Sequence, residues 1–163
     1  NGANTLFFDR NRKSFLSTNT DTIGLKELLA ALPVNSASTV VWGGGGTLNT
    51  LKDAIKSASF YSARTGTNRD ISNEDPQNVF PEILIWAAGN LTLENGAVRF
   101  PYSNWKPKVV IDLSYTLNSI AREYSVSCGA QYISGLAMFE SQARAQQKFW
   151  LQSEKINRSD TIL

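Results

Sequence analysis

Four consecutive glycines at 43–46 separate a β-branched run at 38–42 from an apolar helical pattern at 48–57. Three more short apolar runs, at 59–63, 82–87 and 108–113, follow along the chain. A strand that is apolar at nearly every position is buried on both faces, which is typical of a parallel sheet covered by helices. The sequence therefore predicts an α/β fold, with a parallel sheet and helices on both of its faces.

The segments outside this pattern predict a hairpin and three further helices. Short apolar or β-branched runs at 5–9 and 14–17 flank a polar turn at 9–13, which indicates a β-hairpin. Thr20 or Asp21 is placed to cap a helix that Pro33 stops. Further on we expect a helix at 117–123, a short strand at 131–133 and a long helix at 136–151.

The residue content excludes several classes of chemistry. The 163 residues include no histidine, which excludes Ser-His-Asp and Cys-His catalysis and any His-ligated metal. The single cysteine, Cys128, excludes an internal disulfide and a cysteine cluster, so we expect no metal. We interpret Cys128 as a small buried hydrophobe and assign the four tryptophans to the core or to an interface.

Charge and hydropathy narrow the range of partners. The 16 Lys and Arg residues and 14 Asp and Glu residues give a formal charge of +2, which is too balanced to favour a nucleic acid. No apolar run reaches the ~18–20 residues that a membrane span needs, so we expect no membrane partner. The chain starts at Asn1 without an initiator Met or a signal-peptide pattern, and we expect it to be a piece of a longer protein.

The glycine run lies where a dinucleotide pyrophosphate needs bare backbone. Between a strand and a helix, glycines allow a tight turn and a close approach of the phosphates to free backbone amides. Gly43 and Gly45 fill the first two positions of the dinucleotide fingerprint, whereas Leu48 occupies the third, which is normally small. The alternative is a plain flexible turn, and the strand–turn–helix setting favours nucleotide binding over it.

An arginine follows the next predicted strand, about 20 residues after the first glycine. An acidic residue there would accept the ribose 2′-hydroxyl of NAD, whereas an arginine suits the 2′-phosphate of NADP. No Asp or Glu lies between Lys56 and Arg69, so Arg64 favours NADP, with Thr65 and Arg69 as further donors. The alternative is a solvated arginine at the start of a loop.

Read in order, six segments of the chain resemble motifs of the shikimate dehydrogenase family. The match spans nearly the whole sequence, and six motifs in the family's order are specific although each alone is common. The segments are Ala3-Asn4-Thr5, Asn19-Thr20-Asp21-Thr22-Ile23-Gly24, Gly43-Gly44-Gly45-Gly46, Ala63-Arg64-Thr65, Asp112-Leu113-Ser114-Tyr115, and Gly135-Leu136-Ala137-Met138-Phe139-Glu140-Ser141-Gln142-Ala143 with Phe149-Trp150.

This resemblance implies a cytoplasmic two-domain enzyme of the chorismate pathway to the aromatic amino acids, which reversibly reduces 3-dehydroshikimate to shikimate with NADPH. It implies Asp21 as a catalytic residue and Asn4, Tyr115 and Gln142 as substrate contacts. It places the cofactor contacts at Gly43, Gly44, Gly45, Gly46, Thr47, Arg64, Thr65, Leu113 and Gly135. It also implies a Rossmann-like NADP-binding domain at 21–135, a remnant of the substrate-binding domain at 1–20, and a C-terminal helix at 136–163 that returns toward that domain.

Four departures from the family pattern leave alternatives open. The catalytic lysine of the family lies in the substrate-binding domain, which would precede residue 1, so we expect the chain alone to be inactive. Trp86 stands where the family has a polar residue near the nicotinamide, and Leu48 and Ala63 also differ from the family's motifs. A non-catalytic regulatory or scaffold relative and a quinate dehydrogenase are therefore alternative interpretations, and the sequence gives no oligomeric state.

Overall fold

The computed structural model describes residues 2–33, 38–71, 75–89 and 99–159. The strands are β1 (Thr5–Asp9), β2 (Ser14–Thr18), β3 (Thr39–Gly43), β4 (Ser59–Tyr61), β5 (Ile83–Ala87), β6 (Val109–Asp112) and β7 (Gln131–Ile133). The α-helices are α1 (Thr20–Ala30), α2 (Leu48–Ala54), α3 (Ile120–Cys128) and α4 (Gly135–Ser159), with 3₁₀ turns η2 (Gly45–Thr47) and η3 (Pro76–Asn78). The predicted hairpin and strand positions agree with these bounds to within two residues.

Five of the strands form one parallel sheet in the order β4-β3-β5-β6-β7, and β1 and β2 form a separate antiparallel hairpin. This confirms the predicted α/β, Rossmann-like fold. The chain passes from β3 outward to β4 and then returns across β3 to begin β5. The strand order therefore reverses between β3 and β5, and in open α/β sheets ligands bind outside the carboxyl ends of the strands at such a point.

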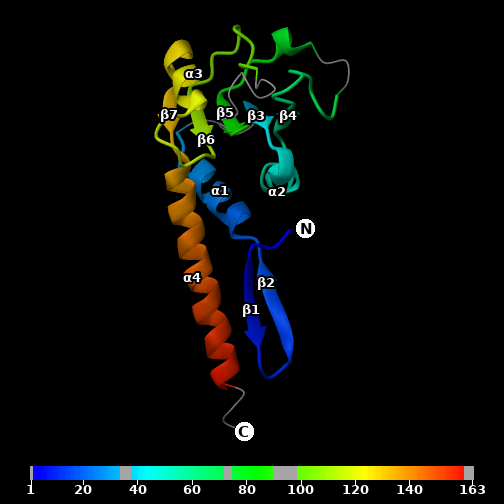
Figure 1. Cartoon of the computed structure of the whole chain (residues 1–163), viewed down its shortest axis with the longest axis vertical. Coiled ribbons are helices and arrows are strands. Elements are labelled where there is room, and N and C mark those ends of the chain that lie inside the picture. Colours follow the sequence, from blue (N-terminus) through cyan, green and yellow to red (C-terminus); the bar gives the residue numbers. More distant parts are fainter. Residues whose placement is uncertain (1, 34–37, 72–74, 90–98, 160–163) are drawn as a thin grey trace.

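Alternate residues along each central strand supply the two faces of the sheet. One face packs Val41, Ile83 and Ile85 against Leu25 of α1 and Met138 of α4. Leu51 of α2 joins the same apolar cluster. This helical face lies toward α1 and α4, the two helices that also pack closely on each other (Figure 1).

The opposite face is covered by α3 and by aromatic side chains from irregular segments. Trp42 and Trp86 point into this cluster together with Tyr124 of α3, and all three side chains are buried. Trp105 packs edge-on against Trp42, with 5.7 Å between ring centroids. Its indole donates to the Pro76 carbonyl at 2.8 Å, so the buried N–H has a partner.

The structure tests two expectations about single side chains. Trp150 is 46% exposed and therefore does not belong to the core, while its indole donates to the Leu6 carbonyl and joins α4 to the hairpin. Its assignment to an interface stays a prediction. Cys128 is half-buried and not fully buried, because it ends α3 where Gly129 turns the chain away from the core. Its thiol contacts the Ser125 carbonyl at 3.6 Å.

Helix ends differ from the predicted ones for local reasons. Asn19, and not Thr20 or Asp21, caps α1, since its side-chain oxygen accepts from the amides of Asp21 and Thr22. The helix predicted from 117 begins at Ile120, because Ser119 caps it. The helix predicted to reach 57 ends at Ala54, and Ile55 leaves helical geometry with its side chain in the core.

The long helix α4 runs from the carboxyl edge of the sheet down along the hairpin, so the hairpin and the last turns of α4 stand apart from the sheet (Figure 1). It extends well past the predicted end at 151, and residues 160–163 of the predicted terminal segment lie outside the described residues. Among the described residues, no helix is long and apolar enough to cross a membrane.

The contact between α1 and α4 depends on Gly24, and we expect Gly24→Ala to lower the free energy of unfolding by about 1–3 kcal/mol, the cost of overpacking. An added Cβ would lie 2.9 Å from the Met138 carbonyl oxygen and 3.0 Å from the Gln142 amide. This holds although alanine favours a helix by ~1 kcal/mol over glycine. Urea unfolding measures the change.

Gly46→Ala is the matched control, because a Cβ at Gly46 would meet nothing within 4 Å. Its stability should stay within about 0.5 kcal/mol of the original, as for most surface substitutions. Equal stability of the two variants would contradict the close α1–α4 contact.

Candidate functional site

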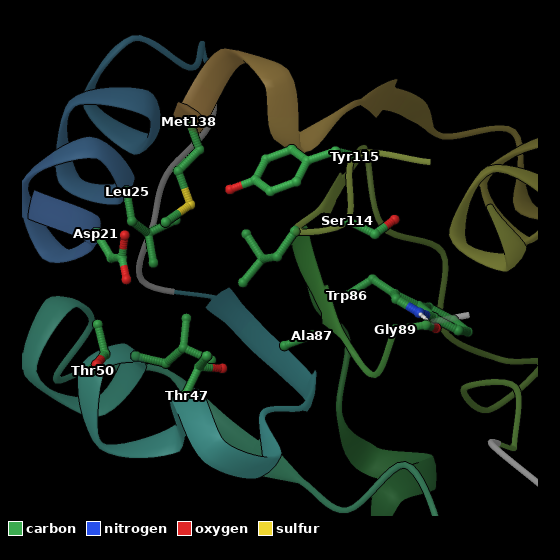
Figure 2. Close-up of a pocket in the computed structure, with 12 residues that line it drawn as sticks. Asp21, Leu25, Thr47, Thr50, Trp86, Ala87, Gly89, Ser114, Tyr115 and Met138 are labelled. Carbon is green, nitrogen blue, oxygen red and sulfur yellow. Dashed lines mark hydrogen bonds between the residues drawn. The ribbon is translucent and has the colours of Figure 1, made fainter. Parts of the chain in front are cut away.

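A pocket of about 220 Å³ lies at the carboxyl edge of the sheet, between α1, α2 and the start of α4 (Figure 2). It is bounded by the ends of β5 and β6, next to the point where the strand order reverses. Its lining residues are Asp21, Leu25, Thr47, Thr50, Leu51, Trp86, Ala87, Gly89, Leu113, Ser114, Tyr115 and Met138. Four predicted site residues therefore border one pocket, namely Asp21, Thr47, Leu113 and Tyr115.

Asp21 enters the pocket from the first turn of α1, where Asn4 of the preceding segment holds it. The Asn4 side-chain amide donates to Oδ1 of Asp21 at 2.8 Å. Its oxygen accepts from the Thr20 backbone amide at 2.9 Å and from the Thr20 hydroxyl at 3.1 Å. The same oxygen accepts from the Thr5 hydroxyl at 3.1 Å. Because the oxygen faces three donors, the NH₂ group must face the carboxylate, and this fixes the Asn4 amide. Asn4 and Asp21 thus form one hydrogen-bonded unit, although their motifs lie 17 residues apart in the sequence.

Burial raises the pKa of two titratable side chains that line the pocket, Asp21 and Tyr115. Loss of solvent raises the pKa of Asp21, and the hydrogen bond from Asn4 opposes part of that shift. Loss of solvent also raises the pKa of Tyr115, and the negative charge of Asp21 raises it further. A carboxylate whose pKa moves toward neutrality is suited to proton exchange, while the phenol stays protonated as a donor.

Hydrogen bonds to Asp112 fix the backbone next to Tyr115. The fully buried carboxylate of Asp112 accepts from the Ser114 amide at 2.9 Å and from the Ser114 hydroxyl at 2.8 Å. The same carboxylate accepts from the Tyr132 hydroxyl at 2.9 Å. Burial, together with this hydrogen bond, raises the pKa of Tyr132 to about 12. The ring of Tyr115 packs edge-on against Phe139, and Figure 2 shows its hydroxyl pointing into the pocket.

Gln142 lies one turn beyond Met138 on α4, against Gly24 of α1. It does not border the pocket itself. Its side-chain oxygen is buried and has no hydrogen-bond partner within the described part of the chain. A buried acceptor without a partner is costly, so this atom is one to which a ligand hydroxyl could donate.

The four glycines have two different roles. A Cβ on Gly43 would lie 2.8 Å from Ala88, and its φ of +103° also disfavours a side chain. Gly44 donates its amide to the Ala87 carbonyl at 3.0 Å. By contrast, Gly45 and Gly46 are exposed, and a Cβ on either would meet nothing within 4 Å. The structure thus uses the first two glycines to join β3 to the end of β5 and leaves the next two open.

The remaining predicted cofactor residues lie in different surroundings. Arg64 and Thr65 are exposed at the tip of a tight turn after β4, in which Gly66 donates to the Ser62 carbonyl at 2.7 Å. They do not border the pocket. Gly135 is buried, and a Cβ there would lie 2.7 Å from the Ser114 carbonyl oxygen. Its first role is therefore to let α4 start close to β6.

Trp86 does not fill the pocket, although it occupies a position where the resemblance implied a polar residue. Its ring belongs to the aromatic cluster on the opposite face, tilted against Tyr124 with 6.0 Å between centroids. The indole N–H donates to the Gly89 carbonyl at 3.3 Å. Figure 2 shows the ring turned away from Asp21 and Tyr115. The substitution therefore leaves the pocket open.

Sequence reasoning missed Met138, Leu25 and Thr50 as pocket residues. The two apolar side chains come from α1 and α4, which approach each other only through the tertiary fold. Met138 lies within the family-like motif at 135–143, and this motif is the sequence feature that could have indicated it.

Comparison with known proteins identifies the fold. No protein-family model matches the sequence, and neither does any curated protein. Among solved structures, a chorismate mutase/shikimate 5-dehydrogenase fusion protein from Clostridium acetobutylicum is similar with a TM-score of 0.67 and 21% identity, over 97% of this chain and 65% of that chain.

Two further similar structures hold ligands. A shikimate dehydrogenase in complex with NADP⁺ has a TM-score of 0.65 and 19% identity, over 99% of this chain and 67% of that chain. A shikimate 5-dehydrogenase from Listeria monocytogenes, in complex with shikimate and NAD, has a TM-score of 0.66 and 16% identity, over 93% of this chain and 63% of that chain. The chain therefore has the fold of shikimate dehydrogenases and spans about two thirds of their length.

We expect the stability of Asp21→Asn, relative to the original protein, to improve as pH rises from about 3.5 to 7. Because burial raises the pKa of Asp21 above 3.8, the folded state binds its proton more tightly than the unfolded state. The original protein therefore loses stability as pH rises from 3.8 through the folded pKa. For a partly exposed group the change should be below about 1 kcal/mol.

Thermal melts of both proteins across this pH range measure the effect. Asp53→Asn, which changes an exposed carboxylate on α2, is the control and should show no such trend. A relative stability of Asp21→Asn that falls with rising pH would mean that the carboxylate is stabilised by its surroundings.

Proposed function

We propose that this chain supplies the cofactor-binding part of a shikimate dehydrogenase, which reversibly reduces 3-dehydroshikimate to shikimate with NADPH. The main support for this proposal is the pocket. It is bordered by Asp21, which Asn4 holds, and by Tyr115. Thr47, which follows the glycines, and Leu113 border the same space. The shared fold with shikimate dehydrogenases supports this choice among enzymes that use dinucleotides.

The residues present fit a dinucleotide. The open backbone at Gly45 and Gly46 leaves space for a pyrophosphate, and the exposed Arg64 lies after the neighbouring strand. One ribose and the nicotinamide would then lie toward Thr47 and Leu113. The cofactor supplies the hydride, which the protein itself cannot provide.

The chain's own residues would act on the substrate by holding protons and excluding water. Reduction of a ketone builds negative charge on its oxygen, which requires a proton and oriented donors. Asp21, which the hydrogen bond from Asn4 holds in place, would exchange a proton with the substrate. The Tyr115 hydroxyl would donate to a substrate oxygen. Leu25, Leu113 and Met138 give the pocket apolar walls, which strengthens these polar contacts.

Two further groups would hold the substrate hydroxyls. The unpartnered oxygen of Gln142 is one, and the amide of Asn4 is the other. The proposal includes the division into 1–20, 21–135 and 136–163, in which the hairpin and α4 belong with a substrate-binding domain. A lysine from that domain would complete the site, and the greater length of the similar structures supports this part.

The cofactor preference follows from Arg64. We expect Arg64→Ala to weaken NADPH binding by ~1.5–3 kcal/mol, the range for a hydrogen bond to a charged group, because its guanidinium would contact the 2′-phosphate. NADH, which lacks this phosphate, should bind nearly unchanged. Calorimetry with both cofactors tests this, and equal affinity of the original protein for the two would contradict NADP specificity.

Turnover tests the reaction itself. In the full-length protein we expect Asp21→Asn to lower kcat for shikimate-dependent NADP⁺ reduction by ~10²–10⁴-fold, the usual loss for a positioned acid or base. The affinity for NADP⁺ should not change, since Asp21 belongs to α1 and not to the glycine loop. Full-length protein that binds NADP⁺ but never oxidises shikimate would instead favour a non-catalytic relative.

A further inference from the structure

Arg99 lies beside Arg64, although the two are far apart in the sequence. Its backbone amide donates to the Ala63 carbonyl at 2.8 Å. Its own carbonyl accepts from the indole N–H of Trp42 at 2.8 Å. Ala63 follows β4 and Trp42 belongs to β3, so Arg99 bridges the carboxyl ends of these two strands.

These two bonds anchor Arg99 to the core. The Trp42 side chain is fully buried, and Ala63 is 6% exposed within the same aromatic cluster. The next segment is also fixed, because the Tyr102 hydroxyl donates to the Gly66 carbonyl at 2.8 Å. The position of the Arg99 Cα next to the turn that carries Arg64 is therefore set by the fold and not by the arginine side chain.

The positive charge at this edge has no fixed counter-charge in the part of the chain that the structure describes. Arg64, Arg69 and Arg99 are all exposed, and none of them forms an ion pair there. Arg69 lies where the chain returns beside β4 after that turn, since its amide donates to the Phe60 carbonyl. The nearby carboxylate of Asp70 is paired with Lys52.

A doubly charged phosphate monoester matches such an arrangement. Guanidinium groups bind phosphate through paired, charge-assisted hydrogen bonds, and two of them can contact one phosphate from different sides. A ribose diol would instead need an acidic acceptor here, and the carboxylate of Asp70, which is nearby among the described residues, already has a partner. The geometry thus favours a 2′-phosphate over a free 2′-hydroxyl.

We propose that Arg99 provides a second guanidinium contact to the 2′-phosphate of NADP, opposite Arg64, and so contributes to cofactor specificity. This inference rests on the proposed function, because it assumes that a dinucleotide binds along the glycine loop. It adds a residue from the connection between β5 and β6, which the motifs after β4 do not include.

Calorimetry on the full-length protein tests the proposal with four probes, namely NADP⁺, NAD⁺, adenosine 2′,5′-bisphosphate and 5′-AMP. We expect Arg99→Ala to weaken NADP⁺ and the bisphosphate about tenfold or more, the usual effect of a lost charge-assisted contact. NAD⁺ and 5′-AMP should bind nearly as before. Arg10→Ala, in the exposed hairpin turn, is the matched control and should change none of the four.

Arg99→Glu is a second variant and should bind NADP⁺ still more weakly while it keeps NAD⁺. Both variants should fold, because the bonds that hold residue 99 come from its backbone. Melting temperatures within a degree or two of the original verify this.

Two results would overturn the inference alone. Equal weakening of NADP⁺ and NAD⁺ by Arg99→Ala would mean that the arginine stacks on adenine. Loss of NADP⁺ affinity in Arg64→Ala but not in Arg99→Ala would mean that Arg64 acts without it. If the original protein binds none of the four probes, the proposed function fails together with the inference.

Discussion

The close contact between the ends of β3 and β5 is the constraint on which the rest of the site depends. Gly43 meets Ala88 where no side chain would fit, and Gly44 donates to the Ala87 carbonyl. This contact joins the two strands at the point where the strand order reverses. The next residues, Gly45 and Gly46, are exposed, and a Cβ on either would meet nothing within 4 Å.

The pocket forms at the carboxyl edge of the sheet, between α1, α2 and the start of α4. Gly24 lets α1 and α4 pack closely, and this places Met138 and Asp21 on two sides of the same space. The partial burial that raises the pKa of Asp21 results from this packing. The hydrogen bond from Asn4 offsets part of the cost of removing this carboxylate from water. The opposite face of the sheet is filled with aromatic rings, including that of Trp86.

Local chemistry explains which parts of the fold were predictable. Strands such as 83–87 and 109–112 are apolar throughout, so their burial on both faces follows from the sequence. Helix ends were less accurate, because competing caps lie close together. Asn19 caps α1 since its side chain reaches two free amides, while Thr20 is itself occupied with Asn4. The separate roles of Gly43 and Gly46 depend on neighbours that are distant in sequence.

By itself the sequence determined the parallel sheet, the hairpin and the order of the motifs, because periodicity and glycine placement act over a few residues. The resemblance of its motifs to a known family also singled out Asp21 and Tyr115 as candidate site residues. Only the tertiary structure decided that these two border one pocket, that the Trp86 ring faces the other side of the sheet, and that Arg99 lies beside Arg64. The physical reason is that each of these outcomes depends on contacts between segments many residues apart, and such contacts form only when the helices and connections pack on the sheet.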